Sequence, residues 1–120
     1  MNIYPSSHVH PLGPVLEDTI AAMVTEGGYV DPAVGEWSAI VAGCDAFLIL
    51  TPQFNWGYPG DLKNAMDHLY GEWRGKVVML VTYGGHGGSK CGTQLRQVLQ
   101  GLKMRVVPEE VSITLPEGYI

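Results

Sequence analysis

The spacing of hydrophobic and polar residues changes several times along the chain. Two short runs, AFLIL within 45–50 and VVMLV at 77–81, are apolar at consecutive positions. Such runs are typical of strands in a parallel sheet covered by helices on both faces. Residues 104–107 predict a third strand. The alternation of apolar and polar residues over 111–115, beyond a proline, predicts a half-exposed edge segment.

The first thirty residues carry a weaker pattern than the rest. Three prolines indicate an extended start, and one short helical face is expected from Leu16, Ile20, Met23 and Val24. Asp31 and Pro32 then supply a capping residue and a proline at the first helical position. The helix that follows is expected to stop at Gly43.

Two further helices are predicted between and after the apolar runs. The first is expected to be capped by Asp61 and to end at Gly75, with apolar residues at helical spacing: Leu62, Ala65, Met66, Leu69, Tyr70 and Trp73. The second begins at Ser89 and has one apolar side: Leu95, Val98, Leu99 and Leu102. Within the first of these helices, Lys63 and Asp67 are one turn apart and predict a solvated ion pair.

The order strand, helix, strand, helix, strand predicts an α/β fold with a parallel sheet. We expect one domain over residues 1–120, since this length suits a single hydrophobic core. Ligands of such sheets bind outside the carboxyl ends of the strands. Two unusual loops, TPQFNWGYPG (51–60) and TYGGHGG (82–88), follow strands at that edge. If their strands are neighbours, the two loops form one site.

Composition and charge exclude several classes of function. The longest apolar runs are too short to cross a bilayer, and the amino end lacks the features of a signal peptide or presequence. We therefore expect a cytoplasmic protein without membrane association. A net charge of −5, with no Lys or Arg before Lys63, argues against binding to nucleic acid.

The sequence has no recognisable hydrolytic or metal-binding motif. Cys44 and Cys91 are expected to be buried thiols, because they form no CxxC pair and lie near no set of metal ligands. The nucleophile motif G-x-S-x-G is absent, so Asp67 and His68 suggest no triad. We predict no catalytic side chain and no metal site.

The first loop combines flat apolar rings with amide groups. Phe54, Trp56 and Tyr58 offer faces for stacking, and Gln53 and Asn55 offer hydrogen-bond donors and acceptors. These groups suit a heteroaromatic ring with polar edges, such as a flavin. Alternatively, Trp56 and Tyr58 pack on a partner subunit.

The second loop presents backbone N–H groups to a ligand. Its four glycines, Gly84, Gly85, Gly87 and Gly88, leave no side chain in the way of a close approach. A tight turn with no ligand is an equally good interpretation, because the loop matches neither phosphate-binding glycine motif. His86 by itself is more often a loop residue than a catalyst.

Residues 51–88, followed by QLRQVLQGLKMRVV, closely resemble the NADPH-dependent FMN reductase family of flavodoxin-like proteins. The resemblance covers roughly residues 37–116. It implies a three-layer flavodoxin-like fold and a homo-oligomer. It also implies that one group of residues holds FMN: Pro52, Gln53, Phe54, Asn55, Trp56, Tyr83, Gly84, Gly85, His86 and Gly87. The family often has Glu and Tyr where this chain has Gln53 and Phe54.

The resemblance further implies hydride transfer from NADPH or NADH to FMN, followed by reduction of a quinone, a free flavin, a metal ion or another small acceptor. The family's first two strands and first helix, with the G-S-x-R loop that binds the FMN phosphate, have no counterpart in this sequence. We expect FMN affinity to be about three to six decades lower without that loop. The alternative is a non-enzymatic remnant, or a subunit that pairs through an uncovered strand edge.

Overall fold

The computed structural model of the chain describes residues 12–15, 21–24 and 28–119. It consists of two compact units, which are described separately. The first comprises Met1–Cys44 and Gly60–Trp73, and the second comprises Asp45–Pro59 and Arg74–Ile120. Within the described residues, every helix is too short or too polar to span a membrane.

In the first unit, helix α2 (Pro32–Ala42) forms as the sequence predicts. The Asp31 carboxylate accepts a hydrogen bond from the Ala33 N–H at 2.9 Å, and Gly43 is the C-cap. Near the start of the unit, Ala21–Met23 forms the short 3₁₀ helix η1. Leu16 and Ile20, from the predicted N-terminal helical face, lie outside the described residues.

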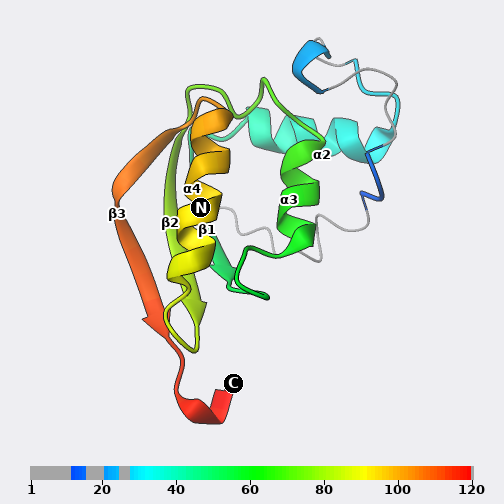
Figure 1. Cartoon of the computed structure of the whole chain (residues 1–120). Helices are drawn as coiled ribbons and strands as arrows, with labels where there is room; N and C mark the ends of the chain where they lie inside the picture. The colour runs from blue at the N-terminus through cyan, green and yellow to red at the C-terminus, as the bar shows by residue number, and fades with distance from the viewer. Residues whose placement is uncertain (1–11, 16–20, 25–27, 120) are drawn as a thin grey trace. The chain divides into compact units, whose positions relative to one another are not determined.

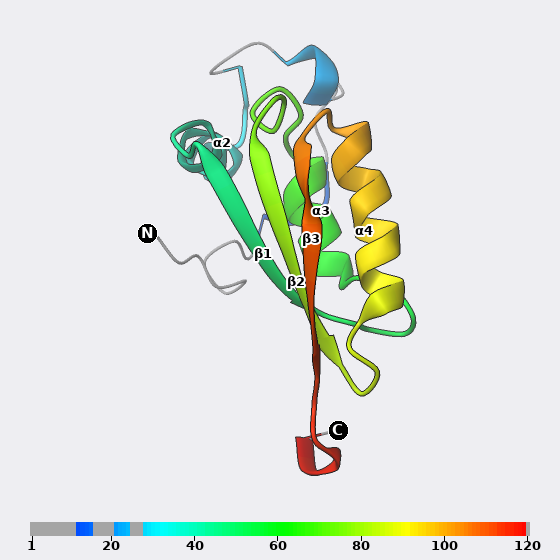
Figure 2. The same cartoon turned by 90° about the vertical axis from the view of Figure 1, so that its left-hand side faces the viewer.

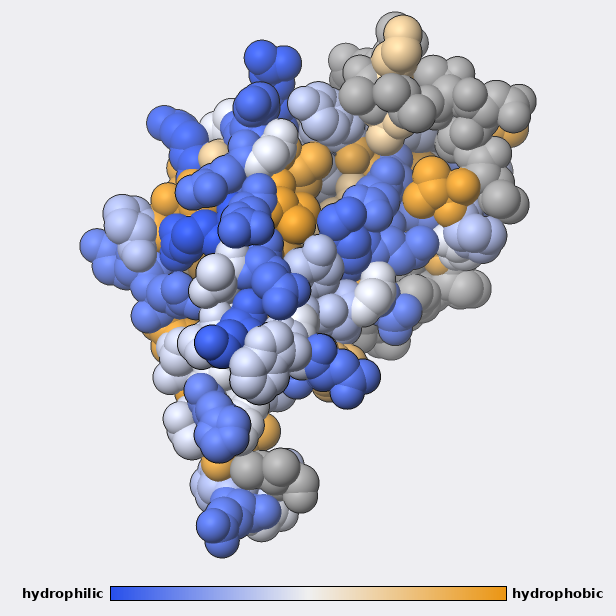
Figure 3. Space-filling view, in the orientation of Figure 1, coloured by the Kyte–Doolittle hydropathy of each residue, from blue (hydrophilic) through white to orange (hydrophobic). Residues whose placement is uncertain are grey.

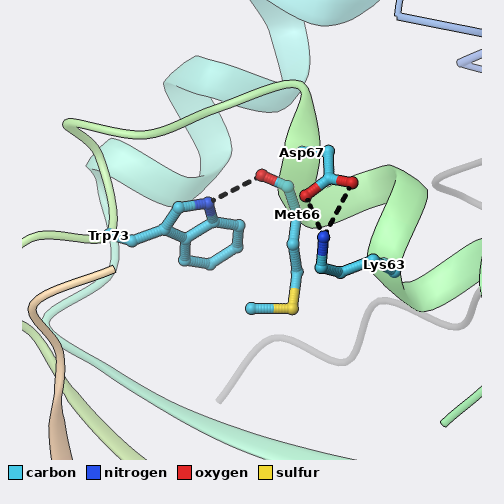
Figure 4. Close-up of polar contacts among 4 residues, drawn as sticks. All are labelled: Lys63, Met66, Asp67 and Trp73. Carbon is cyan, nitrogen blue, oxygen red and sulfur yellow. Dashed lines mark hydrogen bonds and ion pairs between the residues drawn. The ribbon is translucent and has the colours of Figure 1, made fainter. Parts of the chain in front are cut away.

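Helix α3 (Gly60–Asp67) is much shorter than its apolar spacing predicts. Its last carbonyls are taken by two indoles: Trp37 Nε1 donates to the Ala65 oxygen at 2.8 Å, and Trp73 Nε1 donates to the Met66 oxygen at 3.2 Å (Figure 4). The Leu69 N–H also turns back to the Met66 oxygen, at 3.1 Å. The prediction of a helix to Gly75 was therefore wrong, because the indole N–H groups of Trp37 and Trp73 bond the carbonyl oxygens that the next backbone N–H groups of a longer helix would bond.

The start of α3 also differs from the prediction. Asp61 lies in the first turn rather than at the N-cap, since the helix begins at Gly60. One turn later, Lys63 Nζ lies 2.8 Å from an Asp67 carboxylate oxygen, which confirms the predicted exposed pair (Figure 4).

The second unit contains a parallel sheet in the order β1-β2-β3 (Figures 1 and 2). Its strands are β1 (Ala46–Pro52), β2 (Val77–Gly84) and β3 (Arg105–Thr114). Helix α4 (Ser89–Gly101) connects β2 to β3, and the 3₁₀ helix η2 (Glu117–Tyr119) follows the sheet. The predicted parallel α/β arrangement is confirmed.

Strand β3 joins two segments that the sequence pattern separates. Val106 pairs with Val78, whereas Glu110 already pairs with Leu80, so the register shifts between these positions. Pro108 lies in this irregular stretch, and a proline without an N–H is tolerated where a strand bulges at a sheet edge. The expected separate edge segment is thus the second half of β3.

One face of the sheet packs against α4. Its central side chains on β2, Val78, Leu80 and Thr82, are buried, as are Leu95 and Leu99 of α4. The outer surface over α4 is mainly hydrophilic (Figure 3). On the opposite face of the sheet, Leu48 and Leu50 of the edge strand β1 are exposed.

Leu80→Ala is predicted to lower the free energy of unfolding by about 2–5 kcal/mol, because this side chain is 0% exposed and its loss leaves a cavity. The matched control is Leu48→Ala in the neighbouring strand, where the side chain is 62% exposed, and it should cost less than about 1 kcal/mol. Urea unfolding followed by circular dichroism measures both. Equal losses would contradict the assigned faces of the sheet.

Candidate functional site

The pairing of β1 with β2 brings the two unusual loops to one edge of the sheet. Pro52, the last residue of β1, is in register with Tyr83, and the Gln53 N–H continues the ladder by donating to the Tyr83 oxygen at 2.9 Å. Figures 1 and 2 both show the loop after β1 and the loop after β2 at this same end. The predicted adjacency of the loops is confirmed.

The loop after β1 folds into a tight two-residue turn. Phe54 and Gly57 exchange two backbone hydrogen bonds, at 2.8 and 2.9 Å. The residues between them, Asn55 and Trp56, have φ values of 46° and 74°. This is the pattern of a type I′ turn, which normally places glycine at the second central position. A bulky residue there is strained, and such strain is found preferentially at functional sites.

The turn presents its aromatic rings to solvent. Phe54 is 58% exposed and Trp56 is 64% exposed, although aromatic side chains normally gain by burial. Tyr58, further along the same loop, is half-buried. The exposed rings form an apolar surface directly beyond the end of β1.

Helix α4 holds this loop through four interactions that the sequence did not reveal. Gln53 Oε1 accepts hydrogen bonds from the N–H groups of Lys90 and Cys91, at 3.1 and 3.2 Å. Gln94 Nε2 donates to the Trp56 carbonyl oxygen at 3.0 Å. The Lys90 ammonium group lies 5.3 Å from the centre of the Trp56 ring, a cation–π distance. Lys90 and Cys91 lie 37 and 38 positions after Gln53 in the sequence, and Lys90 and Gln94 lie 34 and 38 positions after Trp56. Local spacing in the sequence therefore gave no sign of these contacts.

These contacts change the role expected for Gln53. Its carbonyl oxygen is occupied by the first turn of α4, so only the amide nitrogen is left to face a ligand. Lys90 also places a cation beside the aromatic loop, in a chain whose net charge is −5. The site therefore combines exposed rings with one positive charge.

Two glycines of the second loop are required by the backbone conformation and packing of the loop itself. Gly88 has φ of +76°, and a Cβ there would lie 2.8 Å from the Thr82 Cβ. Gly87 has φ of +79° and lies close to Ser112. The buried Thr82 hydroxyl donates to the Gly87 oxygen at 2.9 Å. The second half of this loop is therefore a tight turn whose glycines are required by the backbone conformation and close packing.

The first half of the loop is where backbone groups remain for a ligand. Gly84 lies at the end of β2, and its oxygen accepts from the N–H groups of Gly87 and Leu115. At the tip, the N–H groups of Gly85 and His86 make no hydrogen bond with any described part of the chain. The His86 side chain is exposed. Two adjacent backbone donors therefore lie beyond the end of β2.

The thiol of Cys91, in the first turn of α4, is buried. Burial raises its pKa above the ordinary value of 9.0; a side-chain hydrogen bond with Thr51 opposes this, and the charge of Glu110 adds to it. The thiol is therefore protonated at neutral pH and is a poor nucleophile. Cys44, expected to be buried, is half-buried instead, with its thiol 3.3 Å from the Ile40 oxygen.

Comparison with known proteins identifies similar sequences and structures. The family model described as NADPH-dependent FMN reductase matches residues 7–116. The chain is 53% identical over 92 residues to an NAD(P)H-dependent FMN reductase of Saccharomyces cerevisiae, covering 77% of this chain and 48% of that protein. It is 50% identical over 92 residues to an NAD(P)H-dependent FMN reductase of Schizosaccharomyces pombe, covering 77% of this chain and 46% of that protein.

A solved structure supports the same fold. FerB, a flavoenzyme NAD(P)H:(acceptor) oxidoreductase from Paracoccus denitrificans, superimposes with a TM-score of 0.72 and 26% sequence identity. The superposition covers 92% of this chain and 62% of FerB. The α/β fold is therefore flavodoxin-like. The chain spans about half the length of the curated relatives it matches.

Gly88→Ala is predicted to lower the free energy of unfolding by at least about 2 kcal/mol, because it adds a methyl group against Thr82 at a positive φ. Gly101→Ala, at the end of α4 where a Cβ meets no atom within 4 Å, is the matched control. It should be neutral or stabilise by about 0.5–1 kcal/mol. Urea unfolding compares them, and a neutral Gly88→Ala would contradict the assigned turn.

The raised pKa of Cys91 predicts a pH dependence of stability. The folded state favours the protonated thiol, so this contribution is fully present below pH 9.0 and is lost as the pH rises through the higher folded-state pKa. The loss of stability between pH 8 and pH 11 should therefore be smaller in Cys91→Ala than in the parent chain.

The measurement is urea unfolding across this pH range, with both variants in a Cys44→Ala background so that Cys91 is the thiol followed. In that background, iodoacetamide should react at pH 8 only as fast as the chain opens. Rapid labelling of the folded chain would show that Cys91 is accessible.

Proposed function

The chain belongs to the NADPH-dependent FMN reductase family, and we propose that its two loops bind the isoalloxazine ring of FMN as part of an NAD(P)H-dependent oxidoreductase. The observation that carries this proposal is the position of both loops at one sheet edge, fixed by the pairing of Pro52 with Tyr83. Ligands of open parallel sheets bind beyond this edge.

The described residues fit a flavin ring in two respects. Exposed aromatic faces at Phe54 and Trp56 suit stacking, and the backbone donors at Gly85 and His86 suit the polar pyrimidine edge of the ring. The residues proposed to hold FMN are those at the two strand ends and their loops: Pro52, Gln53, Phe54, Asn55, Trp56, Tyr83, Gly84, Gly85, His86 and Gly87.

Bound FMN would supply hydride uptake from NADPH or NADH and reduction of a quinone, a free flavin or another small acceptor. The two loops of this chain would position the ring. Backbone donors beside the pyrimidine edge, together with the Lys90 ammonium group, favour extra negative charge on a reduced ring. No acid or base side chain is required for this role.

A second candidate function is self-association without catalysis. It is favoured by β1, an edge strand of the described sheet with exposed Leu48 and Leu50. We also propose that the protein is a cytoplasmic homo-oligomer and that residues 1–120 form a single domain.

Trp56→Ala is predicted to weaken FMN binding about tenfold, because it removes a stacking face. Quenching of FMN fluorescence during titration measures the affinity. Tyr119→Ala, which removes another exposed aromatic ring outside the loops, is the control and should leave the affinity unchanged.

Light scattering after size exclusion tests the second function, because a stable monomer would argue against pairing through β1. If Trp56→Ala alters the oligomer size but not the FMN affinity, the loop is a protein contact. Absence of any quenching by the parent chain at FMN concentrations up to hundreds of micromolar would reject ring binding.

A further inference from the structure

Helix α4 begins without a cap of its own. Its N-cap residue is Gly88, in the left-handed conformation with no side chain to accept a hydrogen bond, and its first turn contains no acidic residue. The first N–H groups of any helix lack intrahelical partners and require acceptors from elsewhere. The start of α4 therefore depends on another part of the chain.

Gln53 is the residue that supplies this acceptor. Its Oε1 receives the N–H groups of both Lys90 and Cys91, as a capping side chain would. Its backbone N–H is bonded to Tyr83 of β2. One residue thus ties together the end of β1, the end of β2 and the start of α4.

Gln94 makes the reciprocal contact. Its Nε2 donates to the carbonyl oxygen of Trp56, whose φ of 74° is strained. Its Oε1 lies where a Cβ on Gly57 would come within 3.0 Å, so the side chain lies against the turn. A strained backbone conformation persists only where its surroundings hold it. Gln94 supplies one of the contacts that hold the Trp56 backbone in this conformation.

We propose that Gln53 and Gln94 are positioning residues that clamp the aromatic loop to α4, so that the Trp56 ring and the glycine loop are already aligned before a flavin arrives. The expected effect of the clamp on FMN affinity rests on the proposed function. The clamp itself is a property of the chain without ligand. Prior alignment lowers the ordering cost of binding.

The experiment compares Gln53→Ala, Gln53→Glu and Gln94→Ala with Gln97→Ala, an exposed position on the same helix. Amide hydrogen exchange, measured by NMR without FMN, follows Lys90 and Cys91. Exchange of these two amides should become about fivefold faster in Gln53→Ala, because a lost cap weakens the first turn. Gln53→Glu should retain protection, since a carboxylate also accepts both bonds and suits a helix N-terminus.

Acrylamide quenching of tryptophan fluorescence reports on the turn when the contribution of Trp56 is obtained as the difference from the same chain carrying Trp56→Phe, and this contribution should be quenched more strongly in Gln94→Ala. The FMN affinity should fall about fivefold in each alanine variant of the clamp, should recover in Gln53→Glu, and should not change in Gln97→Ala.

The outcomes separate the clamp from the proposed function. Unchanged exchange at Lys90 and Cys91 in Gln53→Ala would overturn the clamp whether or not FMN binds. Faster exchange with unchanged FMN affinity would overturn the positioning role. If the parent chain does not bind FMN, the proposed function fails, while the exchange and quenching results still decide whether the clamp exists.

Discussion

The site depends on the parallel pairing of β1 with β2. Because Pro52 and Tyr83 are in register, the chain leaves both strands at the same level of the sheet. Neighbouring strands are about 5 Å apart, so the two loops begin within reach of one small ring. A slip of one residue would turn Gln53 to the other face and separate it from α4. The buried Thr51 and Thr82, both on the face towards α4, are consistent with the observed register.

The aromatic loop and α4 stabilise each other. The turn at Asn55 and Trp56 has positive φ values, which suit Asn55 but are costly for Trp56, and it exposes the Trp56 ring. The helix offers orphan N–H groups at Lys90 and Cys91, and the loop offers the acceptor. Each element therefore satisfies a requirement of the other, which keeps the exposed ring in a defined position.

The glycine loop shows why composition alone did not distinguish between two roles. Gly88 is required by its positive φ and by the closeness of Thr82. At the tip, by contrast, the Gly85 N–H makes no hydrogen bond with the described residues. The structural role and the proposed binding role thus fall on successive parts of the loop 82–88. In the proposed complex the flavin contacts the tip, while contacts with β2 and β3 fix the rest of the loop.

Local patterns in the sequence predicted the three strands, helices α2 and α4, and the common edge of the two loops, because burial imposes its period on each segment separately. They did not predict the end of α3, where the indoles of Trp37 and Trp73 take its last carbonyls, or the continuity of β3 through Pro108. They also missed Lys90 and Gln94 as partners of the aromatic loop. Those features depend on hydrogen bonds between residues distant in the chain, and only the folded arrangement brings such donors and acceptors together.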